Sequence, residues 1–162
     1  MGMTIKMGGA APEFTLASDS GGTLSLIEMK GKIAVLFFYP KDDTTGCTLE
    51  AKDFSDRVPE FAKIGASVVG ISPDSVKSHG KFKAKHGLTL TLLSDETKEM
   101  LQSYGLWVEK SMYGRKYMGV ERTTLLLDAS GKVAQVWEKV KVPGHAQEVL
   151  EAARRLKTGL SG

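Results

Sequence analysis

Cysteine is almost absent from this sequence: of 162 residues, only Cys47 carries a thiol. A single cysteine excludes an internal disulfide framework and any Cys-x-x-Cys redox pair. The three histidines, His79, His86 and His145, are too far apart in the sequence to suggest a zinc site with this cysteine. We therefore expect no bound metal and no cofactor, and we expect the three histidines to lie at the surface.

Long hydrophobic runs and blocks of like charge are also missing. The longest apolar run, Ile33–Tyr39, is far shorter than the ~20 residues that cross a bilayer, and residues 1–9 lack the apolar stretch of a signal peptide. Lysine and arginine are scattered although the net charge is +3, and no nucleic-acid-binding motif is found. These absences argue against membrane and nucleic-acid partners, and we expect a cytoplasmic protein.

The composition that remains is typical of an ordinary folded domain. Hydrophobic residues make up 41% of the chain and charged residues 25%, which lies within the usual range for globular proteins. A chain of this length can bury one hydrophobic core without staples. We therefore predict a single domain over residues 1–162, in which residues 1–9, rich in glycine and methionine, form a flexible tail.

Strand and helix signals alternate along the chain. The apolar run at residues 33–39 predicts a strand buried on both faces of its sheet. From Cys47 to Phe61, apolar residues recur at steps of four and three, as on one face of a helix, and Pro59 should kink or divide this helix. The order predicts an α/β fold, with a central mixed sheet, helices on both faces and an N-terminal β-hairpin. The other predicted strands cover residues 14–17, 23–26, 66–71, 90–93, 122–128 and 133–137, the other helices cover 74–86, 95–103 and 145–156, and residues 107–119 form an irregular connection.

Cys47 lies where the buried strand gives way to the first turn of a helix. Unpaired amide groups and the helix macrodipole favour an anion there, so a thiol in this position ionises readily. Ionisation alone raises reactivity only about thirty-fold, and fast attack on a peroxide also needs donors that hold the oxygen–oxygen bond. Thr44 and the amide groups of Gly46 and Cys47 are candidate donors. The simpler alternative is a cysteine that serves only as a small buried hydrophobe.

The residues around Cys47 resemble a known motif. Pro40, Thr44 and Cys47 match the Pro-x-x-x-Thr-x-x-Cys pattern of the peroxiredoxins. Residues 37–50, which read FFYPKDDTTGCTLE, resemble the bacterioferritin comigratory protein or PrxQ subfamily. Three further segments are similar to the same subfamily in the same order: ISPD at 71–74, LLSD at 92–95, and the strand of Arg122 with its DASG turn. The resemblance covers nearly the whole chain.

This resemblance implies a thioredoxin-like fold and a thiol-dependent peroxidase. Cys47 would attack hydrogen peroxide or an organic hydroperoxide and become a sulfenic acid. Arg122 would stabilise the thiolate and polarise the peroxide, and Glu50 would orient Arg122. Thr44 would form a hydrogen bond with the peroxide, and Pro40 would shield the sulfur from water.

Two positions depart from the subfamily pattern. Lys52 stands where many members carry a resolving cysteine, and the predicted helix at 74–86, where others carry it, has none. The resemblance therefore implies a one-cysteine peroxidase whose sulfenic acid is reduced by an outside thiol, such as thioredoxin, glutaredoxin or a small thiol. It also implies a monomer, as for many members. Thr45 replaces the usual proline, so the loop should be somewhat less rigid.

Simpler roles and a rival function stay open at this point. Thr44 could be only a helix N-cap, Arg122 a solvated residue at a strand end, and Pro40 the end of a strand. A redox sensor or binding module without turnover would use the same fold, because the missing resolving cysteine fits that function too. We expect the apolar residues between 112 and 118 to lie in a loop folded back on the core, and the alternative is that they border the active site or a partner surface.

Overall fold

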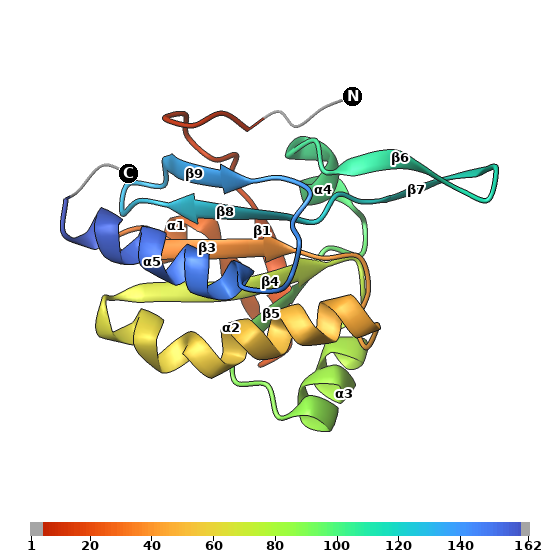
Figure 1. Ribbon diagram of the computed structural model, residues 1–162, viewed down its shortest axis with the longest axis horizontal. Coiled ribbons are helices and arrows are strands. Elements are labelled where there is room, and N and C mark those ends of the chain that lie inside the picture. Colours follow the sequence, from red (N-terminus) through yellow and green to blue (C-terminus); the bar gives the residue numbers. More distant parts are fainter. Residues whose placement is uncertain (1–4, 160–162) are drawn as a thin grey trace.

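The computed structural model describes residues 5–159 and places the long apolar run in the middle of a sheet (Figure 1). Strand β3 (Ile33–Phe38) is buried along its whole length. It pairs in parallel with β4 (Ala66–Ser72) and antiparallel with β8 (Thr123–Leu127). A strand with neighbours on both sides and apolar side chains on both faces needs helices above and below it.

The sheet is mixed, as predicted. Its seven strands follow the order β2-β1-β5-β4-β3-β8-β9. β5 (Thr91–Ser94) pairs in parallel with β4, whereas β9 (Val133–Trp137) pairs antiparallel with β8. At the other edge, β1 (Thr15–Ser18) pairs antiparallel with β5 and also with β2 (Thr23–Ser25). The β1–β2 pair is the predicted N-terminal hairpin.

Helices cover both faces of this sheet (Figure 1). α2 (Thr45–Lys63), α3 (Val76–His86) and α5 (His145–Lys157) contribute to one hydrophobic cluster. α1 (Leu26–Met29) and α4 (Glu99–Ser103) contribute to a second cluster on the opposite face. The α/β prediction is therefore confirmed. Within the described residues, no helix is both long and apolar enough to span a membrane.

The sequence predicts an irregular connection over residues 107–119, but the structure has a β-hairpin there. β6 (Trp107–Met112) pairs antiparallel with β7 (Arg115–Val120), and the hairpin projects from the body of the molecule (Figure 1). Tyr113 and Gly114 form the turn with φ angles of 52° and 78°, as a two-residue turn of type I′ requires. Tyr113 is 98% exposed, so this segment does not fold back on the core as expected.

Pro59 and the N-terminal segment test two further expectations. Of the kink or division expected at Pro59, the division is wrong, because α2 continues through this residue as one 19-residue helix. The predicted flexible tail is wrong for residues 5–9: Ile5 is buried, and the N–H group of Gly8 donates to the carbonyl of Val133 at 2.8 Å. The rest of that predicted tail, residues 1–4, lies outside the described residues.

Two glycines test the packing around the sheet. A Cβ atom on Gly70 in β4 would lie 2.7 Å from a ring carbon of Phe37 and 2.9 Å from a methyl carbon of Leu92. Gly70→Ala should therefore overpack the core and lower the free energy of unfolding by about 1–3 kcal/mol. Gly80, inside α3, has nothing within 4 Å of such an atom, and Gly80→Ala should raise stability by about 0.5–1 kcal/mol. Urea unfolding measures both changes, and equal stability of the two variants would contradict this packing.

Candidate active site

Cys47 lies at the strand-to-helix junction that the sequence predicts. β3 ends at Phe38, a loop follows, and α2 begins at Thr45, so Cys47 is in the first turn of the helix. Its side chain is 1% exposed and packs in the hydrophobic cluster under α2 and α5. Thr44 is the N-cap residue, but its side chain makes no hydrogen bond to the helix. The amide groups of the first turn therefore keep their capacity to bind an anion.

The pairing of β3 with β8 brings a distant arginine to this cysteine. Phe38 lies opposite Thr123 in the register of the two strands, so Arg122 reaches the C-terminal end of β3. Its Nη2 donates to Cys47 Sγ at 3.2 Å, and its Nη1 donates to Glu50 Oε1 at 2.6 Å. The arginine thus joins the sulfur to a carboxylate one helical turn further along α2.

In the ion pair behind the sulfur, the carboxylate is buried and the guanidinium is half-buried. Glu50 is 1% exposed, and burial raises the pKa of its carboxyl to about 7, although Arg122 acts in the opposite direction. Burial also opposes the charge on Arg122, but Glu50 and Cys47 outweigh it and raise the pKa of the guanidinium. Arg122 therefore remains a cation that faces the sulfur, and a neighbouring cation favours the thiolate over the thiol.

The other predicted site residues differ in where they lie relative to this contact. A Cβ atom on Gly46 would lie 3.5 Å from Arg122 Nη2, so the glycine packs against the guanidinium. Thr44 is exposed, and its hydroxyl donates to the carbonyl of Lys41 at 2.9 Å. Pro40 is half-buried in the same loop. The structure therefore joins Gly46 to the cysteine–arginine pair and places Thr44 and Pro40 in the loop just before it.

Two of the three histidines are buried, so the expectation of surface histidines is wrong for them. His79 is 0% exposed and His145 is 6% exposed. Burial lowers the pKa of His145 to about 4, so its ring is neutral, and Nε2 is hydrogen-bonded with Thr124 Oγ1 at 2.8 Å. His86 is half-buried and lies 2.7 Å from Asp43 Oδ1.

His79 belongs to a buried polar cluster below the loop that precedes α2. Its ring nitrogens lie 2.7 Å from Asp42 Oδ2 and 2.9 Å from the carbonyl oxygen of Leu93. His79, Asp42 and Asp74 are near enough to one another to be considered as ligands for a cation. However, hydroxyl groups and a backbone N–H group already donate to both carboxylates. The contacts of these three residues are therefore those of a hydrogen-bond network.

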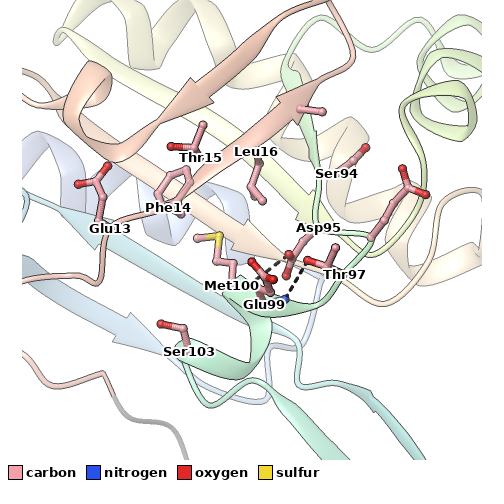
Figure 2. Close-up of a pocket in the computed structure, with 12 residues that line it drawn as sticks. Glu13, Phe14, Thr15, Leu16, Ser94, Asp95, Thr97, Glu99, Met100 and Ser103 are labelled. Carbon is pink, nitrogen blue, oxygen red and sulfur yellow. Dashed lines mark hydrogen bonds between the residues drawn. The ribbon is translucent and has the colours of Figure 1, made fainter.

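A separate hollow of about 690 Å³ lies at the β1 side of the sheet (Figure 2). Phe14 and Met100 contribute apolar surface to it, and several carboxylates, including those of Asp95 and Glu99, surround them. Asp95 accepts a hydrogen bond from the N–H group of Met100 at 3.3 Å. Cys47 is not among the residues that line this hollow, so it is distinct from the thiol site.

A mixed sheet in this order, with a buried cysteine at a helix N-terminus and an arginine on its sulfur, defines a thiol enzyme of the thioredoxin-like class. The sequence pattern of the AhpC/TSA family matches residues 7–136, which is well over half of the chain. The chain belongs to the AhpC/TSA family.

Curated relatives and solved structures agree with this assignment. The chain is 51% identical over 148 residues to the putative peroxiredoxin bcp of Coxiella burnetii, covering 91% of this chain and 98% of that protein. It is 45% identical over 152 residues to peroxiredoxin Bcp of Bacillus subtilis, covering 94% and 97%. A structure of the Xanthomonas campestris bacterioferritin comigratory protein, described for its alkyl peroxide reduction activity, superimposes with a TM-score of 0.87 at 41% identity, covering 96% and 99%. The predicted thioredoxin-like fold and the predicted membership of the peroxiredoxins, which are thiol peroxidases, are confirmed.

The raised pKa of Glu50 makes the stability of the protein depend on pH. Between its ordinary value of 4.5 and about 7, the folded protein holds a proton that the unfolded chain has released. The free energy of unfolding therefore falls as pH rises through this window, by an amount on the order of 3 kcal/mol. Glu50→Gln removes this titration, so its stability should fall less over the window. Urea unfolding across this pH range measures the difference, and equal slopes for the two proteins would contradict the burial of a titrating Glu50.

Proposed function

We propose that this protein reduces hydroperoxides by a one-cysteine mechanism in which Cys47 is the attacking thiolate. The observation that carries the proposal is the 3.2 Å contact between Arg122 Nη2 and the buried sulfur of Cys47. A cation and the free amide groups of a helix N-terminus then meet at one atom, and both favour negative charge there. A cysteine with only a packing role needs neither.

The chemistry follows from this arrangement. The thiolate attacks the terminal oxygen of the peroxide, a sulfur–oxygen bond forms, and the oxygen–oxygen bond breaks. The departing alkoxide or hydroxide takes up a proton and leaves as alcohol or water, and Cys47 becomes a sulfenic acid. Arg122 stabilises the charge as it passes from sulfur to the leaving oxygen. Such electrostatic stabilisation usually contributes most to the rate of an enzymatic reaction. Glu50 keeps the guanidinium in place.

Three neighbouring residues complete the proposed site. The amide groups of Gly46 and Cys47 face the reacting oxygen from the helix, and the missing side chain of Gly46 keeps the space beside Arg122 open. Thr44 exchanges its hydrogen bond with Lys41 for one with the peroxide, because its hydroxyl is already in the loop before the sulfur. Pro40 covers the sulfur on the loop side and limits the access of water.

An outside thiol completes the cycle, because the chain has no second cysteine. A thiol of a partner protein, such as thioredoxin or glutaredoxin, or a small thiol attacks the sulfenic sulfur and displaces water, and a second thiol then releases Cys47. We propose that the protein works in the cytoplasm as a monomer. The rival without turnover, a redox sensor, would be oxidised once and would then stop.

The contact between Arg122 and Cys47 can be tested directly. Cys47→Ser should abolish peroxide reduction. Arg122→Met should slow the oxidation of Cys47 by hydrogen peroxide about 10²–10³-fold, because it removes a donor aimed at the developing charge. Arg122→Lys should fall between Arg122→Met and wild type, since a lysine keeps the charge but cannot bridge the sulfur and Glu50. Stopped-flow measurements of a single turnover give these rates.

Substitution of Arg122 alone leaves the carboxylate of Glu50 buried without a partner, so a control variant replaces both residues. The double variant Arg122→Met/Glu50→Gln lacks both partners of the ion pair and should be as slow as Arg122→Met alone. If Arg122→Met reacts with peroxide at the wild-type rate while remaining folded, the proposed role of the arginine is wrong. Steady-state consumption of peroxide with an added thiol reductant separates an enzyme from a sensor.

A sulfenic acid without a partner thiol is open to further oxidation. We expect excess hydrogen peroxide to inactivate the protein and to add more than one oxygen atom to Cys47 when no thiol is present. A small thiol in excess should prevent both the loss of activity and the increase in mass. Mass spectrometry of the treated protein reports the result, with Cys47→Ser as the control, and a wild-type protein that gains no oxygen at Cys47 would count against the whole mechanism.

A further inference from the structure

The loop that carries Pro40 and Thr44 is held by α3 through a buried charge. Asp42, 7% exposed, accepts hydrogen bonds from Tyr39 Oη at 2.6 Å and from Ser78 Oγ at 2.7 Å. His79 Nδ1 lies 2.7 Å from the same carboxylate. The backbone N–H group of Asp42 donates to Asp74 Oδ2 at 2.8 Å. Asp42 is thus fixed at its backbone and at both carboxylate oxygens.

The protonation state of His79 follows from its two contacts. One ring nitrogen faces the carboxylate of Asp42 and the other faces the carbonyl oxygen of Leu93 in β5. Both partners only accept, so a neutral ring would place a lone pair against one of them, whereas the imidazolium donates to both. Burial opposes this charge, but Asp42, Leu93 and Asp74 outweigh it and raise the pKa of His79 above its ordinary value of 6.5.

We propose that His79 is a positioning residue for the peroxide reaction. It ties Asp42 to β5, and Asp42 in turn sets the loop that carries Thr44 and leads into the first turn of α2 at Cys47. This inference rests on the proposed reaction of Cys47, but it concerns a residue that touches neither the sulfur nor Arg122.

The hydrogen bonds of His79 affect the geometry of the site rather than the ionisation of Cys47. Attack on a peroxide needs sulfur, oxygen and leaving group in line, and a displacement of about 1 Å can cost about a hundredfold in rate. Alkylation of the thiolate also breaks a bond in line, that between carbon and iodide, but it does not use the hydrogen bonds that Thr44 and Arg122 give to the peroxide in the proposed site. The ratio of the peroxide rate to the alkylation rate therefore reports the position of the loop, and the ionisation of Cys47 cancels from it.

Two substitutions separate the two contacts of His79. The amide nitrogen of His79→Gln takes the place of Nε2 and can still reach Leu93, but the contact with Asp42 is lost. The amide nitrogen of His79→Asn takes the place of Nδ1 and can still reach Asp42. We expect the rate ratio, measured with hydrogen peroxide and iodoacetamide, to fall about tenfold to a hundredfold in His79→Gln and less in His79→Asn. A merely structural histidine would move the stability of both variants and leave the ratio unchanged.

Wild-type protein provides a second measurement that needs no substitution of His79. The ring bridges Asp42 and Leu93 only while it is charged, because a neutral ring can donate to only one of them. The ratio should therefore fall as pH rises through the raised pKa of His79, by less than in His79→Gln. The titratable groups that face this ring are Asp42, Asp74 and Tyr39, and burial raises the pKa of Tyr39 well above its ordinary value of 10. Glu50, at the sulfur, also titrates near 7. The step assigned to His79 should therefore persist in Glu50→Gln and disappear in His79→Gln.

The outcomes distinguish this inference from the proposed function. If wild-type Cys47 reacts with peroxide no faster than an ordinary thiol, the peroxidase mechanism itself fails. If wild type reacts fast and His79→Gln keeps the same ratio, only the role of His79 is overturned. If His79→Gln does not fold, the pH series on Glu50→Gln decides the question, because a flat ratio above pH 6.5 contradicts a tie made by the charged ring.

Discussion

The guanidinium of Arg122, held between the sulfur of Cys47 and the carboxylate of Glu50, is the interaction on which the rest of the site depends. The sulfur and the carboxylate share one cation, and Cys47 and Glu50 are each only 1% exposed. Burial disfavours the charged form of the carboxylate and raises the pKa of Glu50 to about 7, although Arg122 acts in the opposite direction. Whenever Glu50 takes up a proton, the charge of Arg122 is left to the sulfur. The glutamate therefore acts as an adjustable partner as well as a mechanical support.

The sheet brings these groups together over a long stretch of chain. Cys47 follows β3 and Arg122 precedes β8, and the antiparallel register of the two strands places both residues at the same end. α2 contributes its uncapped first turn to the sulfur and, one turn later, Glu50 to the arginine. A slip of one residue in this register would turn the side chains of β8 to the opposite face. The buried core around β3 is thus what keeps the thiol and the guanidinium in contact.

Much of this arrangement could be predicted from the sequence, and the failures have identifiable physical causes. The apolar run at residues 33–39 predicted the buried strand, and the motif around Cys47 predicted the family, because both signals are local. The β6–β7 hairpin gave no local signal, since Tyr113 occupies a left-handed turn position that asparagine or glycine usually takes. His79 shares a helix face with Val76 and Phe82, a spacing that indicates burial, but its polarity suggested the surface. Its partners Asp42 and Leu93 come from other elements, which helical spacing cannot reveal.

Two ion pairs lie beside the segment that leads to Cys47: Arg122 with Glu50 at the sulfur, and His79 with Asp42 at the loop. A peroxiredoxin that closes a disulfide within its own chain must bring two cysteines to a Cα separation of about 4.4–6.8 Å, and an attacking sulfur buried under a tied loop must first be released. This chain has no second cysteine, so α3 has no thiol to deliver. Residues of α3 instead contact the loop before Cys47. The buried His79 contacts Asp42, and Lys85 and His86 at the surface bind Asp43 at 2.7 Å each. The absence of a second cysteine and a loop held by α3 are therefore consistent with each other, and in the proposed cycle an outside thiol reaches Cys47 in place of one from α3.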